Sequence, residues 1–307
     1  MNISGVILAA GQGTRMKSPL PKVLHNVLGS PMINYAQEAI SDLKNKYVVV
    51  GHQYETVTLN LFESFIPILQ EEQLGTGHAI SILIESGEYK NDENEYIVVI
   101  PGDVPLIKKE DLKKLIDDVV QGKAAIGIIT AFVDNPDGYG RIVKNNDEFE
   151  KIVEETDASE SEKQINEINS GIYCIEKKFL EKNIGSLETK NIQKEFYLTD
   201  LINIAFQNKL GRVIVQVNED SIQGVNSMSQ LNDVENTLRK QLIESHMENG
   251  VYFQDPNSTY IDKSVQIESG AKILANCHLT GKTIIENNCV IGPNSIINDS
   301  KIGEGSV

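Results

Sequence analysis

The sequence predicts an α/β protein, with a Rossmann-like domain built on a mostly parallel sheet and the start of a parallel β-helix after it. Two observations support this prediction. Up to about residue 226, short apolar runs rich in β-formers alternate with segments of helical spacing, which is typical of parallel strands joined by crossover helices. From residue 261 onward, a large aliphatic residue recurs every six positions, which is the period of a β-helix.

Buried strands and amphipathic helices account for the first part of the chain. The expected strands are Val6–Ala10, Val48–Gly51, Tyr96–Ile100 and Ala125–Val133, and the expected helices between them are Met32–Leu43, Thr76–Ile84 and Glu110–Val120. Ser30 and Pro31 suit the N-cap and first turn of the Met32 helix. Since ligands bind at the carboxyl ends of parallel strands, residues directly after strands are candidates for a functional site.

A connector helix and a hexapeptide repeat follow. Ser227 begins a helix that we expect to run to about Glu248, because apolar residues recur every three or four positions from Met228 to Leu242. The large residues of the hexads are Ile261, Ile267, Ile273, Leu279, Ile285, Ile291 and Ile297, and their smaller partners are Val265, Ala271, Cys277, Thr283, Cys289 and Ser295. The large residue fills a coil and the smaller one fits a corner. The predicted domains are residues 1–226, a connector helix at 227–250 and a partial β-helix at 251–307.

The last repeat is irregular. Ile302 comes one residue early, and the sequence stops within a repeat. Solenoids usually end in a capping element, because an open end exposes apolar surface. We therefore expect either a longer natural protein, truncated here, or a partner that covers this end.

Composition excludes several classes of partner. The 307 residues carry a formal net charge of -16 and a sequence pI of about 4.8, so we expect neither nucleic acid nor an anionic membrane as a partner. The N-terminus does not resemble a signal peptide, and no apolar run reaches membrane-spanning length. Cys174, Cys277 and Cys289 lack CxxC spacing, which predicts buried thiols in a reducing cytoplasm.

The loop after the first strand is the strongest functional signal. It reads Leu8-Ala9-Ala10-Gly11-Gln12-Gly13-Thr14-Arg15-Met16, followed by Leu20-Pro21-Lys22-Val23-Leu24. Glycines let backbone N–H groups approach an anion, and Arg15 and Lys22 supply charge for phosphate oxygens. The loop lacks the third glycine of a dinucleotide fingerprint and the GK[ST] of a Walker A loop. It therefore predicts a different kind of phosphate site.

This loop resembles the signature of the sugar nucleotidyltransferases. Its variant LPKVLH at Leu20–His25 resembles the family of bifunctional N-acetylglucosamine-1-phosphate uridyltransferases/glucosamine-1-phosphate acetyltransferases. The similarity continues through Gln70–Ala79, Gly102–Leu106, Gly138–Ile142, Ile152–Glu154, Glu167–Ile172, Glu195–Asp200 and Gly224–Asn226 into the hexads, and so covers essentially the whole chain. Pro101 departs from the family, which often has Tyr before the Gly-Asp pair.

The resemblance implies a cytoplasmic enzyme that makes UDP-N-acetylglucosamine and pyrophosphate from UTP and N-acetylglucosamine-1-phosphate, a step that supplies peptidoglycan synthesis. An oxygen of the sugar phosphate would attack the α-phosphorus of UTP in line. Asp103 and Asn226 would hold Mg²⁺, and Arg15 and Lys22 would be catalytic by holding the triphosphate. The implied substrate-binding residues are Leu8, Ala9, Ala10, Gly11, Lys22, Gln70, Gly75, Thr76, Gly140, Glu154, Asn169, Tyr197, Thr199 and Asn226.

The same resemblance implies a left-handed β-helix and a homotrimer for the full-length form, and leaves the oligomeric state of this chain open. Acetyl transfer to glucosamine-1-phosphate would reside in later coils, beyond Val307, and so be absent from this chain.

Each assignment has a simpler alternative. Asp103 can be a turn residue, Asn226 a neighbour of a helix cap, and Glu154 part of a solvated acidic stretch. His25, His52 and His78 have no spacing that suggests metal or triad chemistry, which favours structural roles.

Two other functions also stay open. One is a nucleotidyltransferase of the same fold for glucose-1-phosphate with UTP or dTTP, against which the hexads and LPKVLH argue. The other is a non-catalytic nucleotide-sugar-binding module, against which the intact Gly11, Arg15, Lys22 and Asp103 argue.

Overall fold

A computed structural model describes residues 2–307. The chain forms two compact units. The first holds the segment up to Leu24 and Met32–Gly224, and the second holds His25–Pro31 and Val225–Val307. The three-part division at residues 226 and 250 stays a prediction. In the described residues, 2–307, no helix is long and apolar enough to span a membrane.

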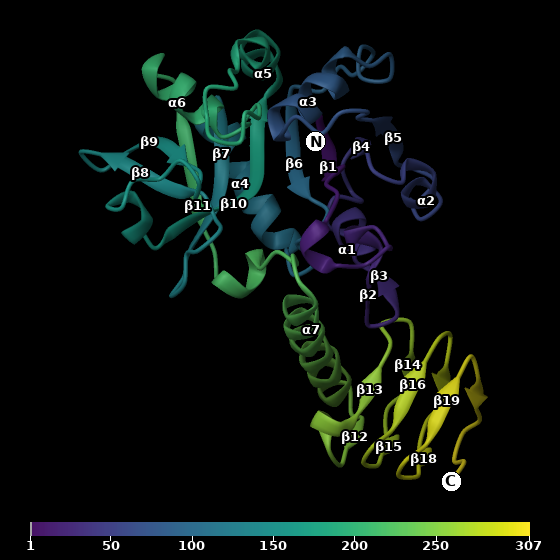
Figure 1. The fold of residues 1–307 in the computed structure, drawn as a ribbon. Helices are drawn as coiled ribbons and strands as arrows, with labels where there is room; N and C mark the ends of the chain where they lie inside the picture. The colour runs from purple at the N-terminus through teal and green to yellow at the C-terminus, as the bar shows by residue number, and fades with distance from the viewer. Residues whose placement is uncertain (1) are drawn as a thin grey trace. The chain divides into compact units, whose positions relative to one another are not determined.

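The first unit is built on one nine-stranded sheet (Figure 1). Its main strand order is β11-β7-β10-β6-β1-β4-β5, with β8 and β9 joined at β10. Along this main order four of the six neighbouring pairs are parallel, and β10 runs antiparallel to both β6 and β7. The predicted mostly parallel sheet is thus confirmed. The strands are β1 Ile3–Ala9, β4 Asn45–Val50, β5 Ile66–Leu69, β6 Tyr96–Pro101, β7 Ile126–Phe132, β8 Arg141–Asn145, β9 Glu148–Val153, β10 Glu167–Glu176 and β11 Arg212–Gln216.

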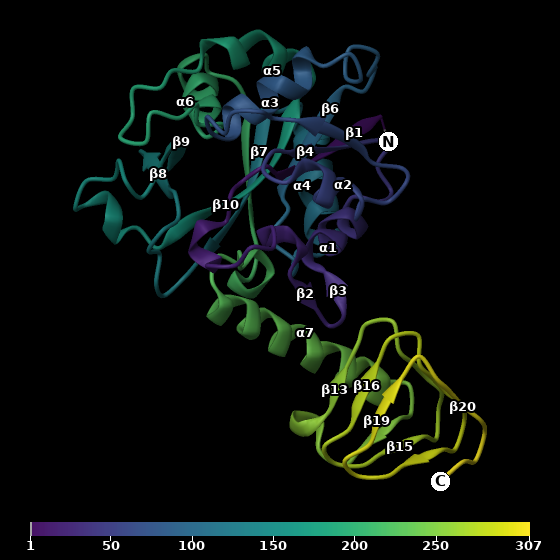
Figure 2. The ribbon, with the colours of Figure 1, turned by 45° about the vertical axis from the view of Figure 1, so that its right-hand side comes forward.

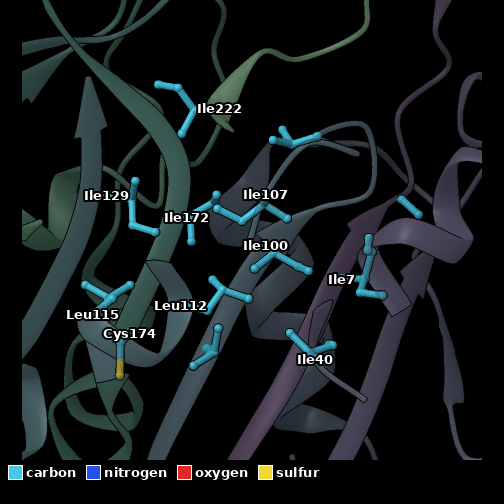
Figure 3. Close-up of a cluster of buried hydrophobic side chains, with 14 of the residues drawn as sticks. Ile7, Ile40, Ile100, Ile107, Leu112, Leu115, Ile129, Ile172, Cys174 and Ile222 are labelled. Carbon is cyan, nitrogen blue, oxygen red and sulfur yellow. The ribbon is translucent and has the colours of Figure 1, made fainter. Parts of the chain in front are cut away.

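Apolar layers cover both faces of this sheet, which explains why its central strands read as continuous hydrophobic runs. Successive residues of β1 enter opposite layers, Val6 one and Ile7 the other, because side chains alternate along a strand. Figure 3 shows the Ile7 layer, where Leu112 and Leu115 meet the strands. The helices of this layer are α1 Met32–Ala39, α2 Tyr54–Thr58 and α4 Lys109–Gly122, and those of the other are α3 Thr76–Glu85, α5 Lys177–Asn183 and α6 Asp200–Gln207.

The predicted N-cap at Ser30 and Pro31 is wrong. These residues form strand β3 (Ser30–Pro31), which pairs antiparallel with β2 (Asn26–Val27), and α1 begins only at Met32. The reason lies in the turn between the two strands, where Leu28 and Gly29 both have positive φ, 46° and 74°. Two consecutive residues with positive φ make a tight hairpin turn. Through this hairpin, a short N-terminal segment belongs to the second unit.

The second unit begins with the connector helix and continues as a β-helix. Helix α7 spans Met228–Glu248, and the side chain of Ser227 caps it by accepting from the Gln230 N–H, as a serine N-cap does. Of the predicted apolar stripe, Val234 is fully buried, whereas Met228 is 48% exposed. Figures 1 and 2 show the short strands after α7 stacked in successive coils.

The hexads give three parallel three-stranded sheets, which confirms the predicted start of a β-helix. Inward residues stack directly, as in the series Ile261, Leu279 and Ile297. The early Ile302 still pairs with Ile285, so the shortened coil keeps its register. The strands are β12 Tyr252–Phe253, β13 Tyr260–Ile261, β14 Gln266–Ile267, β15 Lys272–Ile273, β16 His278–Thr280, β17 Ile284–Ile285, β18 Val290–Ile291, β19 Ile296–Asn298 and β20 Lys301–Ile302.

The corners of the coils show a backbone preference that the spacing of the hexads does not reveal. The residue before the small one of a hexad takes positive φ at Gly270 (78°), Asn276 (60°), Asn288 (56°) and Asn294 (61°). Glycine and asparagine are the residues that adopt this left-handed conformation most readily. At these four corners the turn uses a Gly or Asn beside the small residue, whereas Ser264 and Lys282 precede Val265 and Thr283 without positive φ.

Candidate active site

One cavity of about 480 Å³ lies in the first unit, at the edge where its parallel strands end. The chain leaving β1 lines it, as do Gln70 directly after β5 and Asp103 after β6. The cavity lies where an open α/β sheet normally binds its ligand, and its size is that of a small-molecule site.

Most of the predicted site residues meet in this cavity. They come from segments far apart in the sequence, and the fold alone brings them together. Those that line it are Leu8, Ala9, Ala10, Gly11, Lys22, Gln70, Gly75, Thr76, Asp103, Gly140, Glu154, Asn169 and Thr199. Pro101, at the end of β6, lines it as well.

An ion pair joins the phosphate loop to the end of β6. The ammonium group of Lys22 donates a hydrogen bond to the carboxylate of Asp103, and the two side chains are only 16% and 17% exposed. Gly13 allows Lys22 to pack in this position. The φ of Gly13 is 61°, which favours glycine, and a Cβ at this position would clash with the Cβ of Lys22 at 2.7 Å. A cation and a carboxylate thus face one cavity from two chain segments.

Arg15 belongs to the same loop, in a short 3-10 turn at Thr14–Met16. It is exposed and is not part of the cavity wall. Its charge nevertheless acts on Tyr139, which does line the cavity. Burial raises the pKa of the Tyr139 hydroxyl, and the positive charge of Arg15 opposes that rise. The guanidinium therefore lies within electrostatic range of the site.

Gln70, Gly75 and Thr76 form a second part of the wall, held by hydrogen bonds. Gln70 is 2% exposed, and its Nε2 lies 2.9 Å from Nδ1 of His78, so the predicted structural role of His78 is to orient that amide. Gly75 has φ 104°, and a Cβ there would lie 2.6 Å from the carbonyl oxygen of Phe196. The Thr76 hydroxyl accepts from the Leu198 N–H at 3.1 Å.

Glu154, Thr199, Gly140 and Asn169 form the opposite part of the wall. The Thr199 hydroxyl donates to the Glu154 carboxylate at 3.1 Å, and the Asn169 N–H donates to the Gly140 carbonyl at 2.9 Å. Burial raises the pKa of Glu154, and neighbouring carboxylates, first that of Asp157, raise it further. The solvated alternative for Glu154 does not fit this enclosed environment.

Besides Arg15, two predicted residues are not among those that line this cavity. The Tyr197 hydroxyl donates to Gln193 at 2.7 Å and to Asp157 at 3.2 Å, and its side chain lines a separate cavity of about 470 Å³. Asn226 belongs to the second unit, directly before the Ser227 cap of α7, and its N–H donates to the Gln230 side chain at 2.8 Å. The predicted ligand role of Asn226 stays a prediction.

The cavity also has wall residues to which the sequence assigned no role. They include Gln73, Tyr139, Ser170, Gly171, Tyr173 and Glu195. For Ser170 and Gly171 the sequence does contain a signal, because Asn169-Ser170-Gly171 places turn-forming residues inside a strand. This segment forms a bulge in β10. Asn169 pairs with Thr130 and Tyr173 with Ile128, so an interval of four residues on β10 lies opposite an interval of two on β7.

Fold and site together define a nucleotidyltransferase with a hexapeptide-repeat segment. Residues 5–139 match the MobA-like NTP transferase domain family, and residues 264–299 match six repeats of the bacterial transferase hexapeptide family. Both matches agree with the sheet and coils described above.

Similar proteins are known over nearly the full length of the chain. Bifunctional protein GlmU of Clostridioides difficile is 44% identical, with 100% of this chain and 67% of the relative covered. The GlmU proteins of Alkaliphilus metalliredigens and Carboxydothermus hydrogenoformans are each 41% identical, with 99% of this chain and 67% and 68% of the relatives covered. The chain belongs to the GlmU family, which confirms the family that its motifs indicated.

Proposed function

We propose that the chain transfers the uridylyl group of UTP to N-acetylglucosamine-1-phosphate, forming UDP-N-acetylglucosamine and pyrophosphate. The observation on which the proposal depends is the Lys22–Asp103 ion pair on the wall of the cavity. It places a cation for phosphate oxygens beside a carboxylate suited to a metal ion.

The wall formed by Leu8–Gly11, Gln70, Gly75 and Thr76 is our proposed site for the uridine. The residues at the end of β1 line the cavity there, and a side chain at Gly75 would collide with the carbonyl oxygen of Phe196. The amide of Gln70, oriented by His78, can read one hydrogen-bonding edge of a base. A preformed polar wall of this kind reduces the entropic cost of orienting the nucleotide.

Glu154, Thr199, Gly140 and Asn169 are our proposed site for the sugar phosphate. This wall presents a carboxylate, a hydroxyl and an amide, which are groups that hydrogen-bond to hydroxyl and acetamido groups. The two anionic substrates would then lie side by side, with Lys22 and Arg15 neutralising their repulsion. The main task of the protein would be to align the attacking oxygen and to stabilise charge on the departing pyrophosphate.

The site also fits a divalent cation, which the family implies and which we propose to be Mg²⁺. Asp103 provides an oxygen ligand on the cavity wall. Across residues 2–307, no group of three or more His, Cys, Asp or Glu side chains forms a metal cage. This suits Mg²⁺, which is usually bound through one or two carboxylates, water and substrate phosphates. When bound, it would neutralise phosphate charge. Asn226 as a second ligand rests on the resemblance alone.

Pyrophosphate release from UTP and N-acetylglucosamine-1-phosphate tests the proposal. We expect release that requires Mg²⁺ and that falls by about 10²–10³-fold in Asp103→Ala, because a group acting on transition-state charge is lost. Asp42→Ala is the matched control, since Asp42 pairs with Lys109 on the surface. Glucose-1-phosphate, with UTP or dTTP, serves as the competing substrate. No release with any sugar phosphate, from a folded protein, would support a nucleotide-sugar-binding module instead.

Three further assignments are proposals on the same basis. We propose a cytoplasmic location, supported by the three cysteines, which are free and buried. The homotrimer follows only from the resemblance. So does acetyl transfer, which we assign to no residue of this chain.

A further inference from the structure

We propose that Tyr173 is a positioning residue for the sugar site, because its hydroxyl sets the orientation of the Asn169 side-chain amide. This inference rests on the proposed function, since it concerns the wall that we assign to the sugar phosphate. Tyr173 lies on β10 and lines the cavity together with Asn169.

The β10 bulge brings Asn169 to the cavity wall. Gly171, with φ 76°, allows the chain to turn there. Ser170 pins the bulge to the sheet, because its hydroxyl donates to the Ile129 carbonyl at 2.8 Å and accepts from the Ile172 N–H at 3.1 Å. The backbone of Asn169 is therefore held, and only its side-chain torsions remain to be set.

Two hydrogen bonds set those torsions. Oδ1 of Asn169 accepts from the Gly171 N–H at 3.0 Å, and Nδ2 donates to the Tyr173 hydroxyl at 2.7 Å. A flipped amide would point its NH₂ group at the Gly171 N–H, donor against donor. The observed orientation leaves the second N–H of Nδ2 for a ligand in the cavity.

Tyr173 is well suited to this task because it cannot move away. It is 4% exposed and packs in the hydrophobic layer of the sheet. Burial raises the pKa of Tyr173, and the negative charge of Glu154 raises it further. The hydroxyl therefore stays protonated, so it accepts from Asn169 and keeps its own proton to donate.

Tyr173→Phe tests the proposal by removing only the hydroxyl. We expect kcat/KM for N-acetylglucosamine-1-phosphate to fall about tenfold, the effect of one lost hydrogen bond, while the KM for UTP changes less than twofold. Tyr47→Phe is the matched control, because the Tyr47 hydroxyl is also buried and donates to Asp92 at 3.0 Å, away from the cavity residues. Equal losses for both substrates would overturn the proposal, since they would indicate general damage to the fold.

A double-mutant cycle separates positioning from additive structural effects. If Tyr173 acts through Asn169, then Tyr173→Phe causes no further loss in an Asn169→Ala background. Full additivity of the two losses would contradict the inference.

A spectroscopic test does not depend on turnover. The side-chain amide signals of Asn169, identified by their disappearance in Asn169→Ala, should shift in Tyr173→Phe and not in Tyr47→Phe. If the wild-type protein released no pyrophosphate, the proposed function would be wrong. The shift of the Asn169 signals would still test whether Tyr173 orients the Asn169 amide. Unchanged signals would overturn that role even in an active enzyme.

Discussion

The buried guanidinium of Arg141 donates to the carboxylate of Glu155 at 2.6 Å, and the same carboxylate oxygen accepts from the Gly138 N–H at 3.2 Å. Arg141 is fully buried and also donates to the Tyr139 carbonyl. These contacts fix the segment Gly138–Gly140, every residue of which lines the cavity. The shape of this part of the cavity wall thus depends on a charge pair behind it.

Removing Glu155 should destabilise the first unit. Glu155→Ala leaves the Arg141 charge buried and unpaired, so we expect the free energy of unfolding to fall by about 3 kcal/mol. Glu155→Gln keeps an acceptor and should cost about 1 kcal/mol. Urea unfolding followed by circular dichroism measures both values, and equal stability of all three proteins would contradict the role given to the pair.

The same pair predicts a dependence of stability on pH. Burial disfavours the charge of Glu155, but hydrogen bonds from Arg141 and from the Gly138 N–H outweigh it and hold the pKa below its ordinary value of 4.5. A carboxyl group whose pKa is lower in the folded state stabilises the folded protein fully at pH values above its unfolded pKa. That contribution is lost as the pH falls through the folded pKa. The stability difference between wild type and Glu155→Gln should therefore be largest above pH 5 and shrink below about pH 4. If the stability difference between wild type and Glu155→Gln grew as the pH fell, this prediction would be wrong.

Gly75 should not tolerate a side chain. Its φ of 104° is outside the range of most L-residues, and a Cβ would lie 2.6 Å from the Phe196 carbonyl oxygen. We expect Gly75→Ala to cost about 1–3 kcal/mol of stability and to raise the KM for UTP more than that for the sugar phosphate. Gly87→Ala is the control, since nothing lies within 4 Å of a Cβ there. Thermal unfolding and steady-state kinetics check both expectations.

The β-helix corners predict a contrast between two substitutions at Asn288, whose φ is 56°. Asn288→Gly should leave stability nearly unchanged, whereas Asn288→Ala should cost about 1 kcal/mol, because alanine resists the left-handed conformation. Calorimetric unfolding of the two variants measures the difference. Equal stability would show that the corner conformation does not depend on the residue type.

The repeating and alternating parts of the fold were predictable because their signals are local. The hexads from Ile261 to Ile297 depend on a six-residue period that packing inside a coil imposes, and strands such as β6 depend on their apolar runs. The Ser30–Pro31 prediction failed for a local reason too, since positive φ at Leu28 and Gly29 turned a possible helix cap into a hairpin.

The sequence by itself determined the residue types of the site, namely a glycine loop with Arg15 and Lys22, a carboxylate after a strand, and a polar Asn169 within a strand. Only the tertiary structure decided which of them share a wall and which groups orient them. The Lys22–Asp103 pair spans 81 positions of the sequence, and the hydroxyl of Tyr197 turned to Asp157 and Gln193 instead of the cavity. The physical reason is that a side chain's direction depends on the hydrogen bonds and packing of distant segments, and no local pattern encodes these.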